Sequence, residues 1–126
     1  RSIAVIKYIK QQPALQYFPI GLFGASTGAA AALYAAYSQP EYVNPVVSRG
    51  GRPDLALPIL SEVRVPTLLI VGGQDYEVIR LNEEAKNAMK TECELTIIPG
   101  ATHLFEEQGT IEQAAEKAKQ WFLQHL

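Results

Sequence analysis

Cysteine, basic charge and long apolar runs are all scarce in this sequence of 126 residues. The single cysteine, Cys93, excludes an internal disulfide and is typical of a reducing compartment, so we expect a cytoplasmic protein. The formal net charge of -2 leaves no basic surface for nucleic acid. No apolar run approaches the length of a membrane span, so we expect no membrane partner either.

The patterns that hold metals and nucleotides are missing as well. The chain has only two histidines, and His103 has no Cys, His or Asp neighbour at the spacing that a metal site requires. Gly21, Gly24 and Gly28 do not form Gly-x-Gly-x-x-Gly, and no Gly-Lys-Ser/Thr sequence follows a predicted strand. We therefore expect no cofactor and no metal ion.

Hydrophobic residues make up 48% of the chain and charged residues 19%, which is typical of one globular domain. Strand-like and helix-like segments alternate along it. This alternation predicts an α/β fold, with a parallel sheet of about four strands and helices on both faces, in a single domain of residues 1–126. The predicted strands are residues 20–23, 43–49, 66–71 and 95–98, and the predicted helices are residues 1–12, 27–37, 55–62, 77–90 and a last helix from Thr110.

Periodicity also predicts which side of each long helix faces the core. In the last helix, Thr110 and Gln113 have the spacing of a capping box, in which two side chains satisfy the first backbone N–H groups. The residues expected to face the core are Ile3, Val5, Ile6 and Ile9 in the first helix, Leu81, Ala85, Ala88 and Met89 in the fourth, and Ile111, Ala115, Ala118 and Phe122 in the last.

The most informative stretch is Gly24-Ala25-Ser26-Thr27-Gly28, between the first predicted strand and the second predicted helix. A Gly-x-Ser-x-Gly pattern in this context is typical of a nucleophile elbow, a sharp turn that holds the serine in a strained conformation above the sheet. Gly24 and Gly28 are among the small residues that the close approach of strand and helix is expected to require. Ser26 is therefore the candidate nucleophile.

A serine hydroxyl needs a base within hydrogen-bond reach, and a carboxylate behind that base fixes its tautomer. His103 follows the fourth strand, whereas His125 is next to the last residue, so His103 is the favoured base. Asp75 follows the third strand and is favoured as the acid over Asp54, with a turn or helix-capping role as its alternative. The three favoured residues each follow the carboxyl end of a strand, where parallel sheets bind their ligands.

Two further features concern the substrate. The backbone N–H of Thr27, the residue after the candidate nucleophile, is the expected donor to an oxyanion. Arg49 and Arg52, at the end of the second strand and in the loop after it, are candidates to bind an anionic group such as a carboxylate or a phosphate. The alternative is that these arginines pair with surface glutamates or backbone carbonyls.

Four segments carry a resemblance to dienelactone-hydrolase-like proteins of the α/β-hydrolase superfamily, including versions fused to or encoded with phosphoribosyltransferases. The resemblance covers essentially the whole chain as the C-terminal half of the fold, and it implies a triad of Ser26, His103 and Asp75 that works through an acyl-enzyme. Dienelactone hydrolases use a cysteine nucleophile, so the serine here favours a small ester, thioester or lactone as substrate. The segments are residues 24–28, 48–54, 70–75 and 99–105.

The resemblance also implies a longer domain, with several strands and a helix before the elbow that supply the second oxyanion donor. We therefore expect a truncated domain that is weak or inactive as a catalyst by itself. Ile20, Leu22 and Phe23 would form a bare sheet edge, which we expect an N-terminal half or another copy to cover. A non-catalytic binding or regulatory module that keeps the hydrolase fold is the alternative function.

Overall fold

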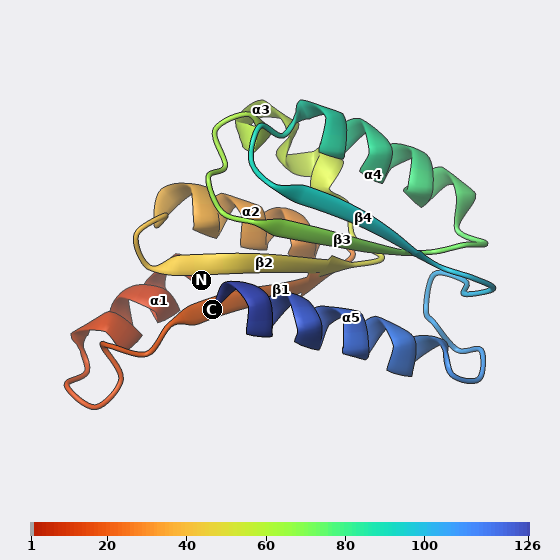
Figure 1. Ribbon diagram of the computed structural model, residues 1–126. Coiled ribbons are helices and arrows are strands. Elements are labelled where there is room, and N and C mark those ends of the chain that lie inside the picture. Colours follow the sequence, from red (N-terminus) through yellow and green to blue (C-terminus); the bar gives the residue numbers. More distant parts are fainter. Residues whose placement is uncertain (1) are drawn as a thin grey trace.

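A parallel sheet of four strands forms the centre of the molecule (Figure 1). The structure is a computed structural model that describes residues 2–126. The strands run in the order β1-β2-β3-β4, and each pairs with its neighbour in parallel. This arrangement confirms the α/β fold predicted from the sequence. The strands are β1 (Ile20–Ala25), β2 (Val43–Arg49), β3 (Thr67–Gly72) and β4 (Cys93–Ile98).

Helices cover both faces of the sheet, as predicted. The helices α1 to α4 share one core cluster with Val46 of β2, whereas α5 packs on the opposite face with Val47 of the same strand. Figure 1 shows α5 alone on its side of the sheet. The helices are α1 (Ser2–Gln11), α2 (Gly28–Ser38), α3 (Leu57–Leu60), α4 (Tyr76–Ala88) and α5 (Thr110–His125), with a short 3₁₀ helix η1 (Pro53–Ala56) before α3.

The strand β3 is buried along its whole length between these two layers. Its apolar residues do not alternate with polar ones, because helices exclude water from both of its faces. Leu68 and Ile70 face the α5 side, where they join a cluster with Trp121. This burial fixes the position of the turn at which β3 ends.

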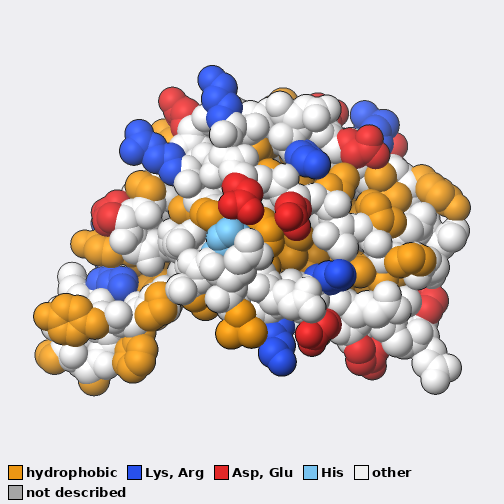
Figure 2. All heavy atoms as spheres, in the orientation of Figure 1, with side chains coloured by type: hydrophobic (Ala, Val, Ile, Leu, Met, Phe, Trp, Pro, Cys, Tyr) orange, Lys and Arg blue, Asp and Glu red, His pale blue; other side chains and the backbone are white. Residues whose placement is uncertain are grey.

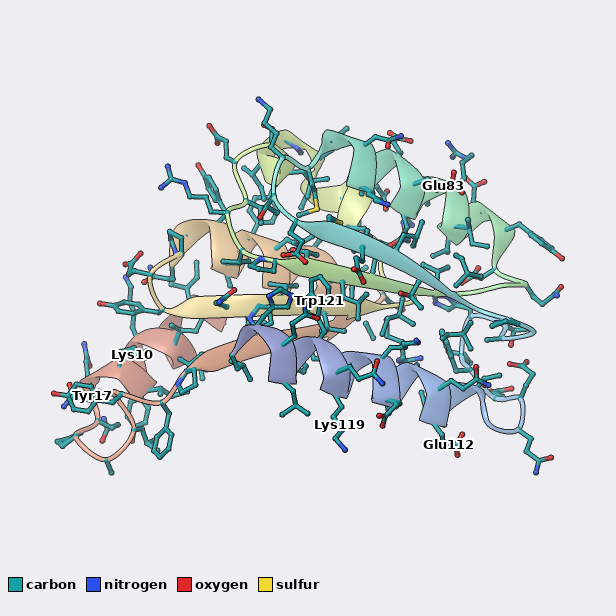
Figure 3. The ribbon with its side chains drawn as sticks, in the orientation of Figure 1. Lys10, Tyr17, Glu83, Glu112, Lys119 and Trp121 are labelled. Atoms are coloured by element: carbon teal, nitrogen blue, oxygen red, sulfur yellow. The ribbon has the colours of Figure 1, made fainter. Side chains whose placement is uncertain are left out.

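The inner face of α5 differs from the predicted one. Its buried residues are Thr110, Ala114, Ala118 and Trp121, whereas Ile111 and Ala115 are exposed. Figure 3 shows Trp121 pointing from α5 toward the sheet, with Glu112 and Lys119 pointing away from it. The helix is rotated so that the largest ring enters the core, and Phe122 packs only at the margin of the cluster.

The predicted capping box at the start of α5 is also wrong. Gly109 occupies the capping position with a φ of 81°, and no side chain caps the helix there. The Thr110 hydroxyl instead donates a hydrogen bond to the Glu107 carbonyl oxygen at 2.7 Å. A left-handed glycine lets the chain turn sharply into the helix, which moves Thr110 inside it.

The predicted inner faces of α1 and α4 are confirmed for most of their residues. Ile6, Ala85 and Met89 are buried, and Ile3 and Ala88 pack against the same core cluster. Val5 of α1 is 56% exposed although it was expected to face the core. In α4 the fully buried residues are Ala85 and the polar Asn82, whereas Leu81 is only partly buried. The structure thus departs from the apolar pattern mainly at two positions, the exposed Val5 and the buried Asn82.

The strand β1 lies at the edge of the sheet and pairs only with β2 among the described residues. Phe23 of this strand is 52% exposed. Figure 2 shows further hydrophobic side chains gathered over α1 and the loop that follows it, where Tyr17 is 88% and Phe18 61% exposed. That an N-terminal half or another copy of the chain covers this edge remains a prediction. No helix within residues 2–126 is both long and apolar enough to cross a membrane.

The rotation of α5 can be tested with two adjacent alanines. We expect Ala114→Asp to lower the free energy of unfolding by about 2–4 kcal/mol, because it buries a carboxylate without a partner. Ala115→Asp places the same side chain in water and should cost less than about 1 kcal/mol, mainly through helix propensity. Urea unfolding followed by Trp121 fluorescence measures both variants. The reverse ranking would restore the face predicted from the sequence.

Candidate active site

Ser26 lies at the sharp turn between the end of β1 and the start of α2. Its φ of 50° is in the left-handed region, which is unusual for a residue other than glycine and typical of a nucleophile elbow. Gly24 makes this turn possible, because a Cβ there would lie 2.7 Å from the Ala29 backbone nitrogen. Gly28 is different: a Cβ there would meet nothing within 4 Å, so the expected need for a small residue at this position is wrong for the described chain.

His103 and Asp75 approach Ser26 from two other turns beyond the ends of the parallel strands. The Ser26 Oγ lies 3.2 Å from His103 Nε2, and His103 Nδ1 lies 2.7 Å from an Asp75 carboxylate oxygen. With Nδ1–H donated to Asp75, the lone pair of Nε2 is directed to the Ser26 hydroxyl. The structure therefore brings together the three side chains that the sequence singled out.

Asp75 also occupies the capping position of α4, which was the alternative role considered for it. Its side chain makes no capping hydrogen bond to that helix. The carboxylate is 16% exposed and is directed to the His103 ring instead. The Asp75 carboxylate is therefore close enough to the His103 ring, and sufficiently shielded from water, to orient it.

The other candidate acid and base, Asp54 and His125, have partners of their own away from Ser26. Asp54 forms a two-bond ion pair with Arg52, with N–O distances of 2.9 and 2.8 Å. The hydrogen bond from Arg52 lowers the pKa of the Asp54 carboxyl, with a smaller opposing effect of burial. His125 packs its ring on Trp121, with 4.3 Å between the ring centroids, at the C-terminal end of α5.

The two candidate arginines have different surroundings. The guanidinium of Arg52 pairs with the Asp54 carboxylate. The alternative considered from the sequence was a glutamate or a backbone carbonyl as partner. Arg49 lies opposite Ala25 in the sheet and places its guanidinium carbon 5.2 Å from the centroid of the Phe105 ring. Within residues 2–126 Arg49 forms no ion pair, and it is partly buried near the segment that carries His103.

The backbone N–H of Thr27 follows Ser26 at the start of α2. No carbonyl oxygen of the described residues accepts a hydrogen bond from it, whereas the carbonyl of Thr27 accepts bonds from Ala30 and Ala31. The donor that the sequence assigned to an oxyanion is therefore unpaired. The role of Thr27 remains a prediction.

Sequence reasoning missed two residues that hold the site loops. Glu107 accepts hydrogen bonds from both the Thr102 N–H (2.9 Å) and the Thr102 hydroxyl (2.6 Å), beside His103. These bonds lower the pKa of the Glu107 carboxyl. Asn82 is a buried amide on α4 that donates to the Gly51 carbonyl. No local pattern predicts either residue. The partner of Asn82 lies in another loop, and the contact of Glu107 with Thr102 depends on the shape of the loop that contains both.

Known protein families provide an independent comparison. The model described as the dienelactone hydrolase family matches residues 1–126, the whole chain. The chain belongs to the dienelactone hydrolase family. The resemblance inferred from the sequence segments is thereby confirmed.

Two curated relatives of this dienelactone hydrolase family member are each named as a phosphoribosyl transferase. They come from Mycobacterium tuberculosis strains CDC 1551 / Oshkosh and ATCC 25618 / H37Rv. Each is 54% identical over 126 residues, and the match covers 100% of this chain but 28% of the relative. The chain thus spans little more than a quarter of the length of these relatives.

Solved structures agree with the family. The dienelactone hydrolase from Anabaena variabilis ATCC 29413 is 49% identical with a TM-score of 0.96, over 98% of this chain and 57% of that one. The esterase domain of a Rhodothermus marinus protein is 20% identical with a TM-score of 0.80, over 97% of this chain and 66% of that one. The second likeness shows the shared fold alone.

The thiol of this dienelactone hydrolase family member is remote from the elbow. Cys93 begins β4, whereas His103 follows the far end of that strand. Burial raises the pKa of the Cys93 thiol to about 11, so the thiol stays protonated near neutral pH. In the described chain no group of three His, Cys, Asp or Glu side chains could hold a metal ion.

The two glycines of the elbow provide a test of its geometry. We expect Gly24→Ala to lower the free energy of unfolding by about 1–3 kcal/mol, because its Cβ collides with the first turn of α2. Gly28→Ala should be neutral or stabilising by up to about 1 kcal/mol, because alanine favours the helix and finds free space. Urea unfolding measures both. Equal losses in the two variants would contradict this account of the turn.

Proposed function

We propose that this chain is a serine hydrolase that acts on a small ester, thioester or lactone. The observation that carries the proposal is the unbroken hydrogen-bond path from Asp75 through His103 to Ser26, at the edge where the parallel strands end. Membership of the dienelactone hydrolase family supports hydrolysis as the class of reaction. The left-handed Ser26 supports its role as nucleophile, because strained conformations of this kind gather at active sites.

In the proposed reaction the Ser26 oxygen bonds to the carbonyl carbon while its proton passes to His103 Nε2. The bond to the leaving alcohol or thiol then breaks, and that group takes the proton from Nε2. A water molecule then gives a proton to His103 Nε2 as its oxygen bonds to the acyl carbon. The bond from that carbon to the Ser26 oxygen breaks, His103 returns the proton to this oxygen, and the acid product leaves. The Asp75 carboxylate stabilises the imidazolium through the bond to Nδ1–H.

The negative charge that develops on the carbonyl oxygen needs donors in fixed positions. The unpaired N–H of Thr27 supplies one of them in this proposal. Loss of a single oxyanion donor typically slows acyl transfer by about 10²–10³. We propose that the second donor comes from a further segment or a second copy placed beside the β1 edge, so that the 126 residues alone turn over slowly.

The surroundings of Arg49 support an anionic substrate. A partly buried guanidinium without an ion pair among the described residues is suited to bind a carboxylate or phosphate. Arg52 is less suited, because Asp54 already occupies its paired N–H groups. In the proposed complex Arg49 binds the charged end of the ester, and the carbonyl group of the ester faces Ser26.

A fluorophosphonate probe tests the nucleophile, because it forms a covalent bond only with an activated serine. We expect peptide mass spectrometry to find the label on Ser26 in the longest folded form of the protein. Ser26→Ala should abolish labelling, and His103→Ala should slow it by about 10³ or more, because the hydroxyl then has no base.

Ser48→Ala is the matched control, since Ser48 is a fully buried serine on β2 whose hydroxyl has no hydrogen-bond partner among the described residues. Its labelling should equal that of the unchanged protein. Absence of label on Ser26 in the folded protein would falsify the proposal. Binding of an ester analogue without turnover, unchanged by Ser26→Ala, would instead favour the non-catalytic binding module.

A pair of esters tests the role of Arg49. We expect Arg49→Gln to raise the KM of an ester that carries a carboxylate by about 10-fold or more, because a charge-assisted hydrogen bond is lost. The KM of a neutral ester of equal length should change by less than about twofold. Arg52→Gln is the control and should affect the two esters alike. An equal effect of Arg49→Gln on both would refute an anion-binding role.

A further inference from the structure

Asn82 is a fully buried amide on α4, in a position where the apolar pattern predicted no inward polar residue. Its Nδ2 donates hydrogen bonds to the Gly51 carbonyl at 3.0 Å and to the Val78 carbonyl at 2.8 Å. Burying an amide costs free energy unless such bonds are made. The bond to Val78 lies within α4, so the bond to Gly51 is the one that joins the helix to another part of the chain.

Gly51 belongs to the loop that leaves β2, and this loop is pressed against α2. A Cβ at Gly51 would collide with Ser48 Oγ and lie 2.5 Å from Ala29 Cβ. The close approach leaves the Gly51 carbonyl facing α4, where Asn82 meets it. The loop is therefore clamped between two helices, with one side-chain hydrogen bond from α4.

The same loop touches two members of the proposed triad. The Arg52 N–H donates to the Ser26 carbonyl oxygen at 2.9 Å. Gly50, with a φ of 54°, lies beside His103: a Cβ there would lie 3.3 Å from the His103 carbonyl oxygen and 3.6 Å from both Nδ1 and Cε1 of its ring. The third member, Asp75, begins the helix that carries Asn82.

We propose that Asn82 is a positioning residue of the active site, which holds the 50–52 loop so that Ser26 and His103 keep their relative geometry. The proposal rests on the proposed hydrolase function. Asn82 touches no reacting atom and acts only through Gly51. A misplacement of about 1 Å in such an arrangement slows reaction by about 10², because the reacting atoms must be aligned.

Two measurements on the full protein test the proposal. Asn82→Leu keeps nearly the same volume and removes both donors, so we expect fluorophosphonate labelling of Ser26 to slow by about 10-fold or more. The pH profile of that labelling should also shift, because the His103 ring loses its support. Amide hydrogen exchange of Gly50 and Arg52 should become faster, since the loop loses its anchor. Ala85→Gly is the control, on the same helix and equally buried, but with no side-chain donor.

Asn82→Ser separates the two bonds, because its hydroxyl can return to the Val78 carbonyl but is too short to reach Gly51. It should behave like Asn82→Leu in both measurements. Labelling within twofold of the unchanged protein, or an equal slowing in Ala85→Gly, would overturn the positioning role. If the unchanged protein takes no label, the hydrolase proposal fails, and the exchange of Gly50 and Arg52 still decides whether Asn82 holds the loop.

Discussion

The burial of β3 between two layers of helices is the constraint on which the rest of the structure depends. All residues of this strand are buried, and its hydrogen bonds to β2 and β4 keep the three strands parallel. Parallel strands end at one edge, so the turns after β1, β3 and β4 emerge there together. Ser26, Asp75 and His103 meet because their turns start from a rigid, dry sheet. Apolar packing of the sheet thus fixes the points at which the loops of the site begin.

Beyond that edge, the conformation of the loops depends on polar contacts and glycines and less on apolar packing. Two glycines shape the loop after β2. A Cβ at Gly51 would collide with α2, whereas Gly50 supplies a left-handed turn beside His103, with a φ of 54°. Asn82 and Glu107 then hold the loops on either side of His103 through hydrogen bonds to backbone groups. The Asn82 amide is buried and therefore costly to leave without partners, which favours one geometry of the Gly51 loop. The bonds of Glu107 lie at the surface. Through these contacts, residues far from Ser26 in the sequence hold the loops that surround it.

The sequence predicted features whose cause is local. The Gly-x-Ser-x-Gly pattern around Ser26 predicts the elbow, and the continuous apolar run of β3 predicts a strand covered on both faces. It failed where several local solutions are equally good. The apolar residues of α5 allow either Ile111 or Ala114 to face inward, and only the space available to the Trp121 ring chooses between them. The pairing of Arg52 with Asp54 depends likewise on the shape of a loop, which no periodicity encodes.

The sequence by itself determined the α/β class, the succession of strands and helices along the chain and the turn that holds Ser26, because each follows from residue patterns within short segments. It also reduced the candidate bases to two histidines and the candidate acids to two aspartates. The positions of His103 and Asp75 after strands favoured these two, but only the tertiary structure shows that their side chains meet Ser26 and each other. His103 is separated from Ser26 by 77 residues and from Asp75 by 28, so their contacts depend on the register and twist of the sheet. The physical reason is that hydrogen bonds act over about 3 Å, and only the folded sheet brings such distant turns within that distance.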